Sequence, residues 1–122
     1  MKTIASAGPW ITQLEIDYVT DACTNGWYNN WSGYIDKFEE SFASWIGVKY
    51  AISTSSCTGA LHIIMAALDI KEGDEVITTP YTFYATIGAI VTAGAKPIFV
   101  DVTDDYNIDP NLIEKKITKK TK

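Results

Sequence analysis

The sequence predicts an α/β fold in which a mostly parallel β-sheet is flanked by helices. Two observations lead to this prediction. From residue 50 onward, short apolar runs alternate with longer segments whose apolar residues recur at helical spacing. The short runs are apolar on both faces, which is typical of strands buried in a parallel sheet. Such alternation builds βαβ units with right-handed crossovers.

Two helices are predicted before the first strand. Residues 11–26 place apolar side chains at helical intervals and stop at Asn25-Gly26. A loop rich in aromatic residues and asparagine follows, "WYNNWSG". Residues 34–47 form the second amphipathic helix, which Gly47 ends. Its apolar face carries Ile35, Phe38, Phe42 and Trp45.

Three strands and three helices are predicted in the rest of the chain. The strands are "YAIST" (50–54), "VITT" (76–79) and "PIFVDV" (97–102). The helices are 58–70, 83–95 and 109–117, and the last is opened by an Asp-Pro pair. Three parallel strands make a very small sheet, and the last strand would have an unpaired edge. We therefore expect residues 1–122 to be one incomplete domain, the first part of a larger α/β domain.

Charge and composition exclude several classes of function. The chain has 122 residues, a net charge of -5 and two cysteines. Its last eight residues, "KKITKKTK", carry five of the ten lysines, so the rest of the chain is strongly acidic and we expect no nucleic-acid partner. The cysteine spacing indicates neither a zinc site nor a disulfide framework. The apolar runs are too short to cross a membrane and no signal segment is present, so we expect a cytoplasmic protein without a membrane partner.

The stretch "TSSCTGALH" (54–62) joins a predicted strand to a predicted helix. Ligands bind beyond the carboxyl ends of the strands in open parallel sheets, and the free amides at a helix start suit a phosphate. Ser56 or Thr58 could equally do no more than cap the helix. The P-loop and the dinucleotide-binding glycine motif are both missing, which disfavours nucleoside triphosphates and dinucleotides.

A second predicted turn carries aromatic side chains. Tyr81, Phe83 and Tyr84 follow the second strand, where one ring could stack on a flat phosphorylated ligand and the others could pack in the core. An aromatic side chain beside an anion site fits pyridoxal phosphate. After the third strand, Asp101 is as well explained by structural hydrogen bonding as by a role in the site, and Tyr106 is placed outside the site.

From "GPWIT" to its end, the chain resembles the N-terminal part of the DegT/DnrJ/StrS aminotransferases. The most specific segments are "GVKYAISTSSCTGALH", "GDEVITTPYTF", "TAGAKPIFVDV" and "YNIDPNLIEKKIT". The resemblance implies the large domain of a fold-type I enzyme that uses pyridoxal phosphate. It also implies an amino-acid donor, expected to be glutamate, a nucleotide-linked keto sugar as acceptor, and a homo-oligomer, expected to be a dimer.

The resemblance assigns cofactor-binding roles to four positions. Thr58 and the backbone of Cys57 correspond to the residues that hold the cofactor phosphate, and Ser56 is their neighbour. Phe83 matches the aromatic residue that stacks on the pyridine ring. The family usually has glycine or alanine at the position of Cys57, and we expect its thiol to be buried and inert.

Three further residues have less specific matches. Tyr28 and Trp31 lie in a stretch that approaches the substrate mouth in this family, so we predict them as substrate contacts; they could equally pack at a dimer interface. His62, a lone histidine on an apolar helix, is better explained by packing than by catalysis.

The resemblance also implies what lies further along than residue 122: the lysine that forms an imine with the cofactor and the aspartate that pairs with its pyridinium nitrogen. A pyridoxal enzyme needs both, so we expect no catalytic residue in this chain and no activity from it alone. Two alternatives stay open. Some members of this superfamily lack the lysine and act as sugar dehydratases, and the chain could also be a non-catalytic remnant that oligomerises and binds a partner or phosphate.

Overall fold

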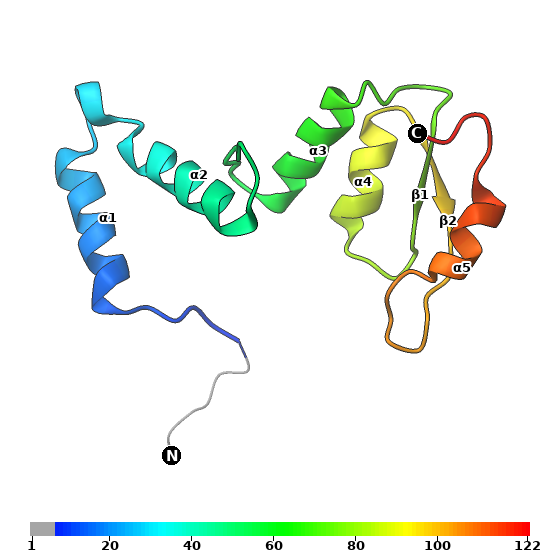
Figure 1. Cartoon of the computed structure of the whole chain (residues 1–122), viewed down its shortest axis with the longest axis horizontal. Helices are drawn as coiled ribbons and strands as arrows, with labels where there is room; N and C mark the ends of the chain where they lie inside the picture. Colours follow the sequence, from blue (N-terminus) through cyan, green and yellow to red (C-terminus); the bar gives the residue numbers. More distant parts are fainter. Residues whose placement is uncertain (1–6) are drawn as a thin grey trace, which may run out of the picture. The chain divides into compact units, whose positions relative to one another are not determined.

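The computed structural model describes residues 7–122, which divide into two compact units at the boundary between Ser53 and Thr54. The first unit holds α1 (Gln13–Asn25), a short 3-10 helix η1 (Tyr28–Asn30) and α2 (Gly33–Ile46). The second holds α3 (Cys57–Ala67), β1 (Glu75–Thr78), α4 (Tyr84–Thr92), β2 (Lys96–Phe99), α5 (Pro110–Ile113) and the 3-10 helix η2 (Glu114–Lys116). Figure 1 shows these elements along the chain. No helix between residues 7 and 122 is long and apolar enough to cross a membrane.

The first unit is held by its helix ends and by hydrogen bonds between α1 and α2. Thr12 and Glu15 form a capping box at the start of α1, and Gly26 follows its last residue. The hydroxyl of Tyr34 on α2 donates a hydrogen bond of 2.6 Å to the Asp21 carboxylate on α1. That bond raises the pKa of Tyr34 to about 12 and lowers the pKa of Asp21.

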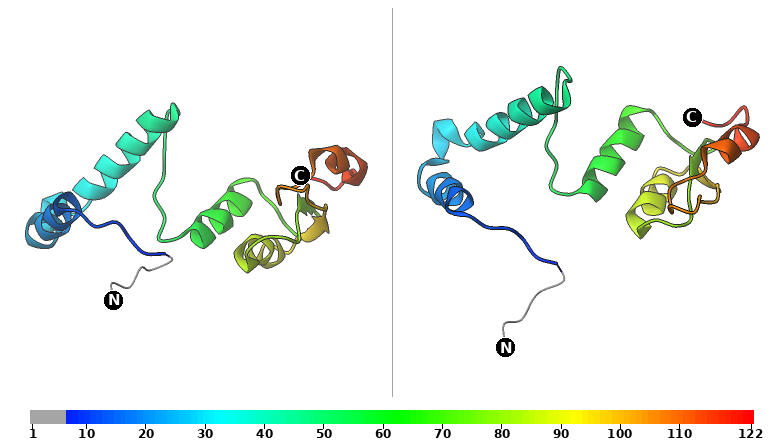
Figure 2. Two further views of the ribbon diagram at one scale, coloured as in Figure 1. Left: turned by 90° about the horizontal axis from the view of Figure 1, so that it is seen from below. Right: turned by 60° about the horizontal axis from the view of Figure 1, so that its bottom comes forward.

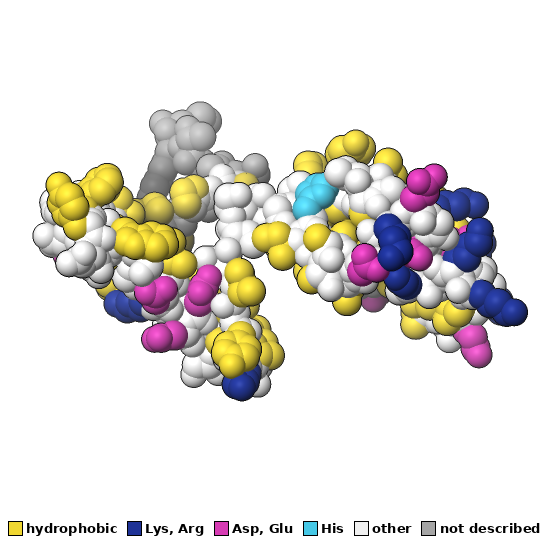
Figure 3. All heavy atoms as spheres, turned by 90° about the horizontal axis from the view of Figure 1, so that it is seen from above, with side chains coloured by type: hydrophobic (Ala, Val, Ile, Leu, Met, Phe, Trp, Pro, Cys, Tyr) yellow, Lys and Arg dark blue, Asp and Glu magenta, His cyan; other side chains and the backbone are white. Residues whose placement is uncertain are grey.

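The end of α2 and its apolar face agree with the sequence. Gly47 adopts a left-handed backbone with φ of 80°, as predicted for a helix stop. Phe42 lies between Phe38 and Trp45, with ring centroids 5.8 and 6.2 Å apart. All four predicted apolar residues of this face are exposed in the structure. Figure 3 shows hydrophobic side chains on the surface of both units.

The second unit is built on a parallel pair of strands. β1 and β2 pair in register from Glu75 with Lys96 to Thr78 with Phe99. Helix α4 packs on the strands and α3 packs on α4, while α5 lies on the other side of the strands (Figures 1 and 2). Ile90 of α4 is almost fully buried and packs with Ile70 and Ala95. This small core orients the turns that follow β1 and precede α3.

Two predictions about the sheet were wrong. Residues 50–54 are extended but do not form a strand, because within residues 7–122 no neighbouring strand hydrogen-bonds to them. The two observed strands are mostly half-buried rather than buried on both faces, since helices cover them only in part. The last predicted helix, 109–117, is present, but only its first part is α-helical: α5 passes into the 3-10 helix η2 at Glu114.

The chain's last residues lie beside β1. The amide of Glu75 donates to the carbonyl of Lys120 at 2.8 Å, and the amide of Lys122 donates to the carbonyl of Glu75 at 3.0 Å. Thr121 thereby forms a parallel bridge to Glu75. Within the described residues, β2 has a strand neighbour on one side only, as predicted for the last strand.

Candidate active site

The turn before α3 is a capped helix start. Ser56 has an extended backbone, and its Oγ accepts a hydrogen bond of 3.1 Å from the amide of Gly59. Its carbonyl oxygen accepts the amide of Ala60 at 3.0 Å and the hydroxyl of Thr54 at 2.9 Å. Ser56 therefore caps α3, which is the simpler of the two explanations predicted for this turn.

Two amides at the same helix start are left without a partner. Among residues 7–122, neither the amide of Cys57 nor that of Thr58 donates a hydrogen bond, and the Thr58 hydroxyl makes none either. Both residues are exposed. A helix start with unpaired amides and a free hydroxyl has the donors that a phosphate requires.

The turn after β1 presents an aromatic ring. Phe83 directly precedes α4 with an extended backbone, and its side chain is 80% exposed. The amide of Thr86 donates to the Phe83 carbonyl at 3.1 Å, and the hydroxyls of Thr82 and Thr86 are 3.0 Å apart. This ring is not used to build the core, so it is available to a ligand.

Thr58 and Phe83 line the same pocket, which has a volume of about 180 Å³. Half-buried His62, one helical turn after Thr58, lines it too, together with Tyr84, Ala85, Gly88, Ala89 and Thr92 of α4. The structure thus brings together the two predicted turns. Phosphate donors on α3 and an aromatic ring before α4 fit the two ends of pyridoxal phosphate.

The other predicted residues have different positions. Cys57 is a free, exposed thiol at the first position of α3, so the expectation of a buried thiol was wrong. Asp101 is not among the residues that line this pocket. Its carboxylate accepts the amide of Val102 at 2.8 Å and its carbonyl accepts the amide of Asp109 at 2.9 Å, so it holds its own loop together.

Tyr28 and Trp31 belong to the first unit. Tyr28 is 93% exposed with a left-handed backbone (φ 53°), and Trp31 is 70% exposed. Exposed rings are available for contact with a sugar or with another protein surface. Their role as substrate contacts stays a prediction.

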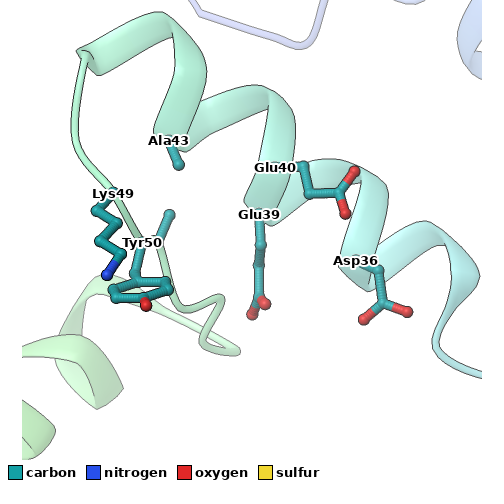
Figure 4. Close-up of a pocket in the computed structure, with 7 residues that line it drawn as sticks. Asp36, Glu39, Glu40, Ala43, Lys49 and Tyr50 are labelled. Atoms are coloured by element: carbon teal, nitrogen blue, oxygen red, sulfur yellow. The ribbon is translucent and has the colours of Figure 1, made fainter.

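A second pocket, of about 220 Å³, lies in the first unit between α2 and the segment that follows it. Figure 4 shows Asp36, Glu39 and Glu40 along α2, and Lys49 and Tyr50 on the segment that follows it. Three carboxylates against one lysine would repel a phosphate. This pocket is therefore a poor site for a phosphorylated cofactor.

Glu39 has a structural role in that pocket. Its carboxylate accepts hydrogen bonds from the amide of Ser53 at 2.7 Å and from the Ser53 hydroxyl at 2.9 Å, which lowers the pKa of Glu39. The sequence did not predict the contact between Glu39 and Ser53, because the two residues are 14 positions apart and no local pattern links them.

A model of the DegT/DnrJ/EryC1/StrS aminotransferase family matches residues 9–122. The chain belongs to this family. The predicted family and the predicted α/β fold class are thereby confirmed.

Known relatives agree with this assignment. GDP-perosamine synthase of Escherichia coli O157:H7 is 42% identical over 123 residues, which cover 100% of this chain and 34% of that protein. A Streptococcus pneumoniae protein assigned as a sugar aminotransferase, solved in its PLP form, has a TM-score of 0.88 at 31% identity, over 99% of this chain and 31% of that one. The family's dependence on pyridoxal phosphate (PLP), implied by the resemblance, is confirmed.

A dehydratase also shares the fold. GDP-4-keto-6-deoxymannose-3-dehydratase, solved with a trapped PLP-glutamate geminal diamine, has a TM-score of 0.86 at 25% identity, over 98% of this chain and 33% of that one. The chain spans about a third of the length of the curated relatives that it matches.

Proposed function

We propose that this chain provides the phosphate-binding and ring-binding turns of a PLP-dependent aminotransferase that acts on a nucleotide-linked keto sugar. The observation that carries the proposal is the shared pocket of Thr58 and Phe83. Family membership supports the reaction class, and relatives such as GDP-perosamine synthase support a nucleotide sugar as substrate.

The two turns have separate tasks in this proposal. The amides of Cys57 and Thr58 and the Thr58 hydroxyl donate to the cofactor phosphate, while Ser56 keeps the helix start in place. Phe83 lies against one face of the pyridine ring and excludes water from it. When bound, PLP supplies the electron sink through which an amino group moves from an amino acid to the keto sugar.

Glutamate is our proposed amino donor. The related dehydratase structure contains an adduct of PLP with glutamate, which supports the same amino acid here. The cytoplasmic location and the homodimer stay predictions.

The proposal is tested by removing the Thr58 hydroxyl. Thr58→Val deletes one hydrogen bond to a charged phosphate, a loss of about 1.5–3 kcal/mol, or about 10- to 150-fold in affinity. Titration with PLP, followed by absorbance, measures this directly, and titration with inorganic phosphate tests the phosphate end alone. We expect both affinities to fall.

Two variants serve as controls. Thr58→Ser keeps the hydroxyl and should bind like the wild type, and Thr92→Val alters the same pocket on α4 without touching the start of α3. If Thr58→Val binds PLP as tightly as the wild type, the turn is only a helix start and the proposed phosphate site is wrong.

The dehydratase is the second candidate function, favoured by the similarity to GDP-4-keto-6-deoxymannose-3-dehydratase. Both reactions use the same cofactor and the same turns, so the PLP titration does not separate them. An assay with a nucleotide-linked keto sugar and glutamate on the whole protein does, because only the aminotransferase releases an amino sugar.

A further inference from the structure

The rings of Tyr81 and Tyr106 lie against each other. Their centroids are 5.3 Å apart and their planes differ by 31°. Tyr81 belongs to the turn after β1 that also carries Phe83, and Tyr106 belongs to the loop after β2. In Figure 1 both turns lie at the end of the sheet where the strands finish. Tyr106 was predicted to lie outside the site, and it is far from Tyr81 along the chain.

The loop after β2 holds Tyr106 in an unusual backbone conformation. Its φ is 65°, in the left-handed region that a large side chain rarely adopts. The amide of Tyr106 donates to the carbonyl of Thr103 at 2.9 Å, and the amide of Thr103 donates to the carbonyl of Asn107 at 2.9 Å. A left-handed backbone at a large residue persists only where the surrounding structure holds it in place. Here it places the ring of Tyr106 against the ring of Tyr81.

Hydrogen bonds at the base of the loop fix it further. Val102 and Ile108 form an antiparallel bridge, and the amide of Asp109 donates to the carbonyl of Asp101 at 2.9 Å. The carboxylate of Asp105 accepts the amide of Asn107 at 3.2 Å. Tyr106 is thus presented by a closed, internally bonded loop.

The turn that carries Phe83 has little support of its own. Between Pro80 and Phe83, the hydrogen bonds in the described structure are that of the Tyr81 amide to the Thr79 hydroxyl at 3.2 Å, that of Thr82 with Thr86, and that of the Thr86 amide to the Phe83 carbonyl. All three are local, within four residues along the chain. The contact of Tyr81 with Tyr106 connects this turn to a distant part of the fold, the loop after β2.

We propose that Tyr106 is a positioning residue: its ring supports Tyr81 and thereby holds the turn that presents Phe83 to the cofactor ring. The inference rests on the proposed function, since Phe83 matters only if PLP binds in this pocket. Tyr106 itself does not line that pocket.

Tyr106→Asn is the variant that isolates the ring. Asparagine tolerates the left-handed backbone, so the loop keeps its conformation while the aromatic contact is lost. Tyr106→Phe is the matched control, because it keeps the ring. An aromatic pair of this kind corresponds to about a 2- to 12-fold change in an equilibrium constant.

Two titrations test the inference on the whole chain. We expect Tyr106→Asn to weaken PLP binding by about 2- to 12-fold and to leave the affinity for inorganic phosphate unchanged, because the phosphate end lies at α3. Tyr106→Phe should match the wild type with both ligands. Tyr81→Leu should resemble Tyr106→Asn, and the double variant should lose no more than either single variant, since both remove one contact.

Hydrogen exchange followed by mass spectrometry gives a readout without cofactor. Peptides that cover residues 79–86 should exchange faster in Tyr106→Asn than in the wild type or in Tyr106→Phe. Unchanged exchange, unchanged PLP affinity in Tyr106→Asn, or an equal loss of PLP and phosphate binding would each overturn the positioning role. If the wild type itself binds no PLP, the proposed function fails instead, and the exchange data still show whether Tyr106 holds the turn.

Discussion

Replacing Ser56 by alanine separates helix capping from cofactor binding at the turn before α3. The Ser56 Oγ accepts the Gly59 amide at 3.1 Å, an ordinary distance, at an exposed site. Loss of such a cap costs about 1 kcal/mol of stability. With an unfolding entropy of about 2.1 cal/mol/K per residue, a chain of this length should melt about 4 °C lower. PLP affinity should change little, because the unpaired donors belong to Cys57 and Thr58.

Thermal unfolding followed by circular dichroism at 222 nm measures the first effect, and the PLP titration measures the second. Ser56→Asp is the informative comparison. Aspartate is an equally good cap, so the melting temperature should be restored, but its charge repels the phosphate. At about 4 Å in water that repulsion is about 1 kcal/mol, or about fivefold in affinity. If Ser56→Ala melts like the wild type but loses PLP affinity, Ser56 is a ligand rather than a cap and the division of roles is wrong.

Two further substitutions test other parts of the structure. Tyr34→Phe removes the hydrogen bond to Asp21, so the chain should be less stable at neutral pH. The pKa of Tyr34 is raised to about 12 and that of Asp21 is lowered, so this contribution is lost as the pH rises through about 12, or falls through the lowered pKa of Asp21. An alkaline absorbance titration should show one late-titrating tyrosine that Tyr34→Phe lacks. Gly59→Ala should raise stability by about 0.5–1 kcal/mol in urea unfolding, because its added carbon would lie 3.6 Å from the Ser56 Oγ, an ordinary contact. The same methyl should lower PLP affinity by narrowing the turn, and unchanged affinity would place the phosphate elsewhere.

Local signals predicted most of the helices. Asn25-Gly26 and Gly47 end α1 and α2 as expected, and the Asp109-Pro110 pair opens α5, with the Asp109 carboxylate accepting the Asn111 amide at 2.9 Å. Each of these features depends on residues within a few positions of one another. The strand at 50–54 was wrong for the opposite reason. The composition of residues 50–54 suits a strand, but a strand forms only by hydrogen bonding to a neighbouring strand. Composition does not show whether such a neighbour is present.

In the candidate site, too, features set by neighbouring residues were predicted and contacts between distant residues were not. Local signals placed Ser56 and Thr58 at a helix start and Phe83 in an aromatic turn, the resemblance to the family gave them their predicted cofactor roles, and the fold brings Thr58 and Phe83 to one pocket. The contact between Tyr81 and Tyr106 could not be found in this way. It depends on a left-handed backbone at a tyrosine, which no residue preference indicates, and on the distance between two separate turns.

Capping and phosphate binding are not competing explanations of the turn before α3. A helix start has several unpaired amides, and one serine side chain satisfies only one of them. Here Ser56 takes the amide of Gly59, deeper in the helix, which leaves the amides of Cys57 and Thr58 at the outer edge. A cap that binds the inner amide therefore leaves the two outer amides free for an anion, and this is why the Ser56 substitution should affect stability while the Thr58 substitution should affect affinity.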